Sequence, residues 1–294
     1  MADKDTSVWM YSPSFALAVI GCIVYCLLFL AITYLTLIKY RAWYFIVVVI
    51  GAAVEVAGYV CRVYSVKHQT DLPPFVMTLT FTVLAPIFVA AGNYLLISRL
   101  IPLVLPSTHH AIFGIPGRLL TPIFVTTDVL AFLIQGSGSG IASSNNWVGP
   151  NEEIGRWVLV GGLAFQFVCF GIFLCIFVRF HHLAKLYTLH DAPVGWHKVV
   201  LAVYVSSIAI MIRCVYRVCE FAEGMNGYAF RTEWLFWVWE TIPMLIAIGI
   251  FCWHHPSRHL GNSLAKVKQA KSRKARQGNK GDKSEAISTP EEQV

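Results

Sequence analysis

Seven long apolar runs, separated by short polar segments, extend along the chain from residue 13 to residue 253. Each run is close to the roughly 20 residues that an α-helix needs to cross a bilayer. We expect the helices at 13–38, 43–65, 73–98, 118–140, 157–180, 198–221 and 234–253. A transmembrane barrel would instead show short strands with alternating polar and apolar positions. The pattern therefore predicts an all-α, polytopic membrane protein with seven transmembrane helices.

Composition supports this class. The chain of 294 residues is 56% hydrophobic and 13% charged, whereas soluble domains carry about 25% charged residues. Its eight cysteines all fall within the apolar runs, so we expect no disulfide in the outer loops. The sequence contains no Walker A phosphate-binding motif, which argues against an ATP-driven pump.

The basic residues predict the orientation of the helices. The segments after the first, third and fifth runs, together with the C-terminal tail, hold sixteen Lys and Arg residues, and the opposite segments hold four. Cytoplasmic loops of membrane proteins carry an excess of Lys and Arg. We therefore expect the N-terminus outside and the C-terminus in the cytoplasm.

This topology divides the chain into three parts. Residues 1–12 are an extracellular N-terminus, 13–256 the seven-helix transmembrane domain, and 257–294 a basic, disordered cytoplasmic tail. The tail carries six basic residues between 266 and 276, which could bind anionic lipid at the inner leaflet. A solvated tail that only fixes the topology is the alternative. Most of the net charge of +7 comes from this tail, and we expect no nucleic-acid partner.

Ionisable side chains inside the apolar runs are the strongest functional signal. Such a side chain at the bilayer centre costs from about 2.5 to more than 10 kcal/mol, so it is seldom kept without a use. With the polar residues that share their helix faces, they form one set of candidate ligand-binding residues. The set is Arg213, Tyr216, Arg217, Glu220, Glu240, Glu55, Tyr59, Arg62, Asp128 and Gln135.

The depth of these residues predicts where a ligand would bind. At 1.5 Å per residue, Glu55 and Asp128 lie near the bilayer midplane, where they would pair with arginines or relay protons. The residues expected in the outer half are Arg62, Gln135, Arg213, Arg217, Glu220 and Glu240. Because both signs of charge are present, we expect a polar, partly hydrated cavity that opens outward. The alternative is an ion-pair network that only fixes helix register, with the pairs Arg217–Glu220 and Glu55–Arg62.

Histidines are frequent on the expected cytoplasmic side, and they offer a different hypothesis. Imidazoles clustered at one membrane face can hold iron or zinc, and His254, His255 and His259 are close together in sequence. Carboxylates that would accompany such a site are scarce there, and interfacial histidines are the commoner explanation. We therefore predict no metal site and no cofactor.

Several short motifs, taken in order, resemble a known family. They include Glu55-Val-Ala-Gly-Tyr-Val-Cys-Arg62, Arg213-x2-Tyr-Arg217-x2-Glu220, Pro243-Met244 and His255-Pro256. Together they resemble the fungal lipid-translocating exporters, a family named for resistance to aminocholesterol that includes sphingoid long-chain-base exporters. The resemblance implies a fungal, often plasma-membrane, protein linked to lipid export or drug resistance. Glu240 departs from the family, which generally has Asp there.

These observations favour a translocator of amphiphilic lipids or lipid-like toxic compounds over an enzyme. Arg213 and Arg217 would hold an anionic headgroup, or would position Glu220 and Glu240 for a cationic amine. The expected partners are membrane lipids or amphiphilic small molecules. A seven-helix stress or lipid sensor is the second hypothesis, and a histidine-metal enzyme acting on lipid is the third.

Overall fold

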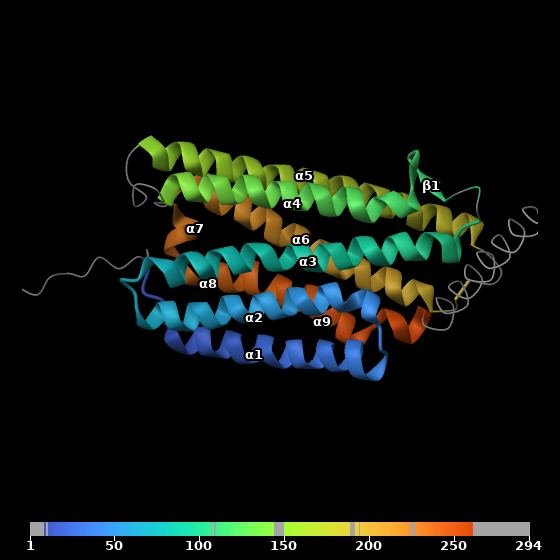
Figure 1. Cartoon of the computed structure of the whole chain (residues 1–294), viewed down its shortest axis with the longest axis horizontal. Coiled ribbons are helices and arrows are strands. Elements are labelled where there is room, and N and C mark those ends of the chain that lie inside the picture. The colour runs from blue at the N-terminus through green and yellow to red at the C-terminus, as the bar shows by residue number, and fades with distance from the viewer. Residues whose placement is uncertain are drawn as a thin grey trace, which may run out of the picture.

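The computed structural model describes residues 9, 11–106, 108, 110–143, 150–188, 192–193, 195–224 and 227–260. Its α-helices are α1 (Phe15–Thr33), α2 (Ile46–Lys67), α3 (Leu72–Val104), α4 (Gly117–Ser143), α5 (Pro150–Tyr187), α6 (Trp196–Glu223), α7 (Tyr228–Arg231), α8 (Glu233–Phe236) and α9 (Ile242–Trp253). Within these residues seven segments are helical, long and apolar enough to cross a membrane, which confirms the predicted class. They run alternately up and down one elongated bundle (Figure 1).

Most helices continue beyond the apolar runs that predict them. The expected run 73–98 is part of α3, which ends at Val104, and the run 157–180 is part of α5, which reaches Tyr187. An apolar run marks only the hydrocarbon core, whereas backbone hydrogen bonding continues into the polar interface. The last membrane segment ends at Leu260 and so includes the first residues of the expected tail. The tail beyond it lies outside the described residues.

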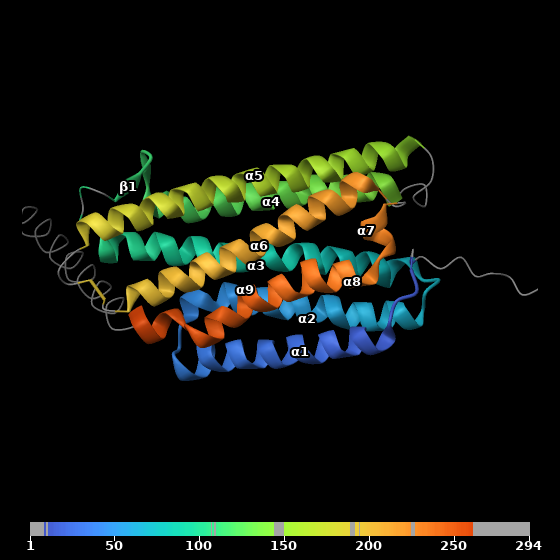
Figure 2. The ribbon, with the colours of Figure 1, turned by 180° about the vertical axis from the view of Figure 1, so that it is seen from behind.

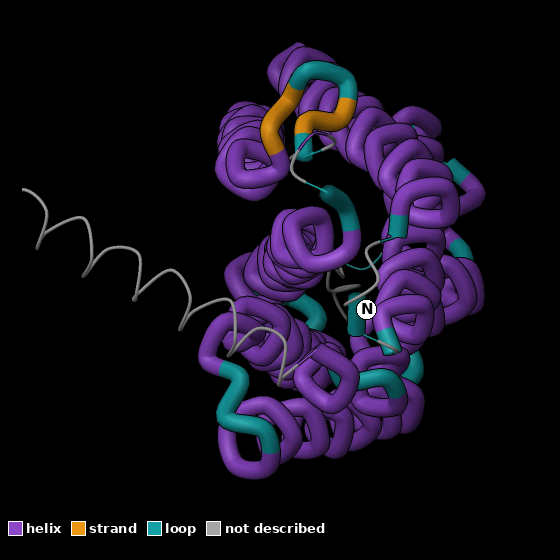
Figure 3. The backbone as a smooth tube through the Cα atoms, turned by 90° about the vertical axis from the view of Figure 1, so that its right-hand side faces the viewer, coloured by secondary structure: helices purple, strands orange, loops and turns teal. Residues whose placement is uncertain are grey.

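Helices α6 and α9 occupy one face of the bundle. From behind, α6 crosses the bundle obliquely and α9 runs beside it (Figure 2). Helix α6 contacts α3, α5 and α9, and α9 also contacts α1. Viewed along the bundle, the long helices pack side by side (Figure 3). Side chains of α6 therefore reach both halves of the bundle.

The seventh membrane segment is irregular near its start. A π-helical turn, η4 (Trp237–Thr241), joins α8 to α9. Pro243 lies two residues after the end of this turn and has no N–H to donate to it. The carbonyl of Thr241 accepts a hydrogen bond from the Tyr25 hydroxyl at 2.8 Å. This irregular turn carries Glu240.

Short irregular elements connect the remaining helices. A π-helical turn, η1 (Tyr34–Lys39), and a 3-10 turn, η2 (Trp43–Phe45), link α1 to α2. Strands β1 (Ala111–Ile112) and β2 (Ile115–Pro116) form a hairpin between α3 and α4. Both residues of its turn, Phe113 and Gly114, have positive φ, as tight hairpin turns require.

Candidate functional site

Two arginines of α6 share one carboxylate of η4. Arg213 and Arg217 are four residues apart, so they lie on one face of α6. Each donates to Oε1 of Glu240, at 2.7 Å and 2.6 Å. All three side chains are at most 4% exposed. Charge-assisted bonds of this length are strong only where water is excluded, which is the case here.

A second carboxylate completes the charge of this cluster. Nη1 of Arg217 donates to Glu220 at 2.9 Å, and the Tyr216 hydroxyl donates to the same carboxylate at 3.1 Å. The predicted pair Arg217–Glu220 is thus present. Two arginines and two glutamates then form a buried, formally neutral network, which we call the charge cluster: Arg213, Arg217, Glu220 and Glu240.

Helix α3 contributes Thr82 to the charge cluster, a residue that the sequence argument missed. The Thr82 hydroxyl accepts from Arg217 at 3.1 Å, and its carbonyl oxygen accepts from Arg213. The residue four positions later is Pro86, which has no N–H for that carbonyl. A proline inside a membrane helix marks a free carbonyl one turn earlier, and this signal could have identified Thr82.

The charge cluster is not fully satisfied. Among the described residues, Oε2 of Glu240 and Nε of Arg213 and Arg217 are buried and have no hydrogen-bond partner. A buried polar atom without a partner costs about 1–3 kcal/mol. The cluster therefore keeps hydrogen-bonding capacity that a ligand or a water could use.

A second cluster lies at the end of the bundle where α1 begins. Arg62 lies 3.6 Å from Glu233 and donates to the Tyr11 hydroxyl at 2.9 Å. Its guanidinium also lies 4.0 Å from the ring centre of Phe236. Burial raises the pKa of the Tyr11 hydroxyl, although Arg62 acts in the opposite direction. The predicted pair Glu55–Arg62 was wrong: these residues are two helical turns apart, and Glu233 lies nearer to the guanidinium.

A small cavity connects the two clusters. Arg62, Arg217 and Glu220 line it together with aromatic side chains, and its volume is about 30 Å³. Such a volume admits one or two water molecules. Five of the ten candidate residues therefore lie together: the four of the charge cluster and Tyr216, which contacts Glu220. Arg62 lies across the small cavity from them.

The other candidate residues make separate contacts. Tyr59 hydrogen-bonds the Thr241 hydroxyl at 2.6 Å, beside Glu240 in sequence. Asp128 accepts from the Tyr94 hydroxyl at 2.9 Å. Glu55 is 2% exposed, and no described residue forms a hydrogen bond or ion pair with it. The prediction that Glu55 and Asp128 pair with arginines was therefore wrong, because the arginines are occupied by Glu220, Glu233 and Glu240.

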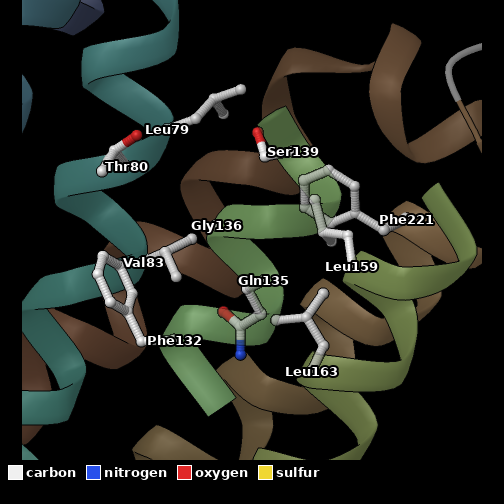
Figure 4. Close-up of a pocket in the computed structure, with 10 residues that line it drawn as sticks. All are labelled: Leu79, Thr80, Val83, Phe132, Gln135, Gly136, Ser139, Leu159, Leu163 and Phe221. Carbon is white, nitrogen blue, oxygen red and sulfur yellow. The ribbon is translucent and has the colours of Figure 1, made fainter. Parts of the chain in front are cut away.

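Gln135 belongs to another pocket, among α3, α4, α5 and α6 (Figure 4). Its Nε2 donates to Oε1 of Gln166 at 2.9 Å. The ten candidate residues therefore do not line one cavity. Helical periodicity correctly predicted on which face of its helix each candidate residue lies. It does not predict how one helix is rotated relative to its neighbours.

The described histidines form no metal-binding group. No three His, Cys, Asp or Glu side chains of the described residues are placed to hold a metal ion. His255 hydrogen-bonds the Thr36 hydroxyl at 3.2 Å and stacks on Tyr40. His109 and His190 lie outside the described residues. The contacts of His255 are those of a packed interfacial side chain.

Known proteins similar to this chain come from fungi. Protein RTM1 of Saccharomyces cerevisiae is 29% identical over 209 residues, which are 70% of this chain and 65% of RTM1. The probable lipid transporter atnI of Emericella nidulans is 29% identical over 268 residues, 86% of this chain and 68% of atnI. The sphingoid long-chain base transporter RSB1 of S. cerevisiae is 26% identical over 262 residues, 77% of this chain and 68% of RSB1.

The alignment covers slightly less than two thirds of RTM1. No solved structure matches the chain. A family model described as RTA1 like protein matches residues 48–263, which include all ten candidate residues, every helix from α3 to α9 and all but the first two residues of α2. This span is well over half of the chain. The chain is therefore a member of the RTA1-like family.

Proposed function

We propose that this protein translocates amphiphilic lipids or lipid-like compounds across a membrane, and that the charge cluster binds the polar head of its substrate. The observation that carries the proposal is the buried network of Arg213, Arg217, Glu220 and Glu240 in a membrane-spanning bundle. Ionisable groups in membrane segments commonly mark a substrate or ion path. The names of the relatives, a probable lipid transporter and a sphingoid long-chain base transporter, support the same class of substrate.

The unpartnered acceptor of Glu240 favours a cationic head over an anionic one. The arginines of the bundle interior are all paired with carboxylates, whereas Glu55 and Asp128 have no cationic partner among the described residues. Oε2 of Glu240 also has no partner. An added ammonium group would donate to Oε2 of Glu240, whereas an added phosphate could use only the unpartnered Nε groups of Arg213 and Arg217, beside two carboxylates that repel it.

In this mechanism the substrate amine competes with the arginines for Glu240. When the amine binds Glu240, the contacts from Arg213 and Arg217 weaken. Arg217 then keeps Glu220 and the Thr82 hydroxyl as acceptors, and Arg213 keeps the Thr82 carbonyl oxygen. The π-helical turn that carries Glu240 has the least regular backbone of the seventh segment, so it is the element best able to move. The proposed function also includes a plasma-membrane location and a contribution to resistance against toxic amphiphiles.

Glu240→Gln tests the proposal in liposomes that contain the purified protein. The assay follows transbilayer movement of a fluorescent long-chain amine by the accessibility of its headgroup. Loss of one charge-assisted hydrogen bond costs about 1.5–3 kcal/mol, so we expect the rate to fall about tenfold or more. Glu153→Gln makes the same charge change at an exposed position in the first turn of α5 and should leave the rate unchanged.

Two results would contradict this function. Equal rates for wild type, Glu240→Gln and Glu153→Gln would show that the charge cluster is not part of the transport path. Equal rates in protein-free and wild-type liposomes would show that the protein does not transport the amine. This result would favour the sensor hypothesis. Size-exclusion profiles of the variants show whether a slower rate reflects misfolding.

A further inference from the structure

We propose that the pocket around Gln135 is a lateral binding site, through which a hydroxyl-bearing amphiphile reaches the charge cluster from the bilayer. This side pocket has a volume of about 70 Å³. Its lining residues come from α3, α4, α5 and α6 and include Leu79, Thr80, Gln135, Gly136 and Phe221 (Figure 4). The inference rests on the proposed function and adds a route and a recognition group to it.

One polar group of the side pocket is a buried amide whose oxygen has no partner among the described residues. Gln135 is 4% exposed, and its Nε2 is used by Gln166. Its Oε1 has no hydrogen-bond partner among the described residues. In Figure 4 this oxygen points from α4 toward the side lined by Val83 and Phe132. The oxygen is an acceptor in an apolar pocket, so the matching ligand carries a hydroxyl or amine donor on an apolar body.

The position of the opening identifies the source of the ligand. Thr80 on α3 and Gly136 on α4 line the pocket and are exposed. Both residues belong to segments long and apolar enough to span a membrane. In a bilayer, the molecules that face such an opening are lipids and other amphiphiles. Because the cavity is about half the 150 Å³ of a cavity that holds benzene, it admits a short part of such a molecule rather than the whole.

The side pocket adjoins the small cavity between the two charged clusters. Leu79 lines both of them. Phe221, which lines the side pocket, directly follows Glu220 of the charge cluster. A flexible leucine side chain therefore lies between an apolar pocket and a charged one. An amphiphile whose hydroxyl binds Gln135 would have to displace Leu79 to bring its amine to Glu220.

Gly136 allows the side pocket to be filled without disturbing the fold. A Cβ atom added at Gly136 would meet no atom within 4 Å. The same holds for Gly161 on α5, which is exposed and does not line the pocket. Leucine is a better helix former than glycine. Gly136→Leu should therefore block the pocket in a folded protein, and Gly161→Leu is its matched control.

The test uses a photoactivatable long-chain amino alcohol with wild type, Gly136→Leu and Gly161→Leu in lipid nanodiscs, with labelled peptides mapped by mass spectrometry. We expect labels on peptides containing residues 79–83, 132–139 or 159–163 in wild type and Gly161→Leu. In Gly136→Leu this labelling should fall about tenfold, which corresponds to a lost affinity of about 1.4 kcal/mol. Equal labelling of all three proteins, or no wild-type label on these peptides, would overturn the inference.

Gln135→Leu tests the recognition group separately. Loss of the acceptor should weaken binding of the amino alcohol about fivefold and leave binding of the alkylamine without the hydroxyl nearly unchanged. An equal effect on both probes would refute recognition of the hydroxyl. Pocket labelling without transport in liposomes would uphold the side pocket and reject the proposed function. Transport without pocket labelling would do the reverse.

Discussion

At the scale of single residues, Glu240 holds two buried cations with one oxygen atom. Removal of one partner from a buried ion pair costs about 3–5 kcal/mol, because the other charge stays buried. We expect Glu240→Gln to lower the unfolding temperature in detergent strongly, and Arg213→Gln added to it to restore part of the loss. The double variant keeps the pair Arg217–Glu220 and is again formally balanced. Strictly additive losses, measured by thermal unfolding, would show that the two side chains are not coupled.

Thr82 allows a second test of the charge cluster, in which only its hydroxyl group is replaced. Thr82→Val keeps the shape of the side chain but removes the hydroxyl that accepts from Arg217. Hydrogen bonds to charged groups contribute about 1.5–3 kcal/mol, so we expect a clear loss of stability. Thr82→Ser retains the hydroxyl and should lose less, although it removes a methyl group. Thermal unfolding of both variants would contradict this contact if the serine protein were the less stable one.

The residue scale also shows what the sequence could not predict. Helical spacing alone predicted which residues share a face of α6 and of α2. It also predicted the pair Arg217–Glu220, because these residues are three positions apart on one helix. Arg62 instead pairs with Glu233, which is distant in sequence. Its partner depends on how the seventh segment is placed against α2. Periodicity within one helix contains no information about that placement.

At the scale of elements, hydropathy was sufficient to find all seven membrane segments but not their contacts. The contact of α4 with α5 depends on glycines whose neighbours only the structure shows. A Cβ atom at Gly138 would lie 2.5 Å from the backbone nitrogen of Leu159, and one at Gly155 equally close to the backbone nitrogen of Ala142. These two helices can approach closely only because side chains are absent at both positions.

A pair of alanine substitutions on α4 tests this contact. Gly138→Ala introduces a clash with backbone atoms, which cannot rotate away, so α5 must move and stability must fall. Gly136→Ala meets nothing within 4 Å and should be neutral or slightly stabilising, since alanine favours the helix. We expect overpacking at Gly138 to cost about 1–3 kcal/mol, measured by thermal unfolding. Equal unfolding temperatures for the two variants would contradict the close contact of α4 with α5.

At the scale of the whole molecule, the orientation in the membrane decides which side the charged clusters face. Arg62, Glu233 and Tyr11 lie at the end of the bundle where α1 begins, and the charge cluster adjoins them across a small cavity. If that end faces outward, substrate heads are released or captured outside the cell. The excess of Lys and Arg near the other ends of the helices predicts this orientation.

Glycosylation mapping tests the orientation directly. A short extension with an N-glycosylation site is added before residue 1 in one protein and after residue 294 in another, and both are expressed in a eukaryotic cell. Because the basic segments should remain in the cytoplasm, we expect a glycan on the N-terminal extension and none on the C-terminal one. A glycan on the C-terminal extension alone would reverse the orientation. The charged clusters would then face the cytoplasm, and the side pocket would draw its ligand from the inner leaflet.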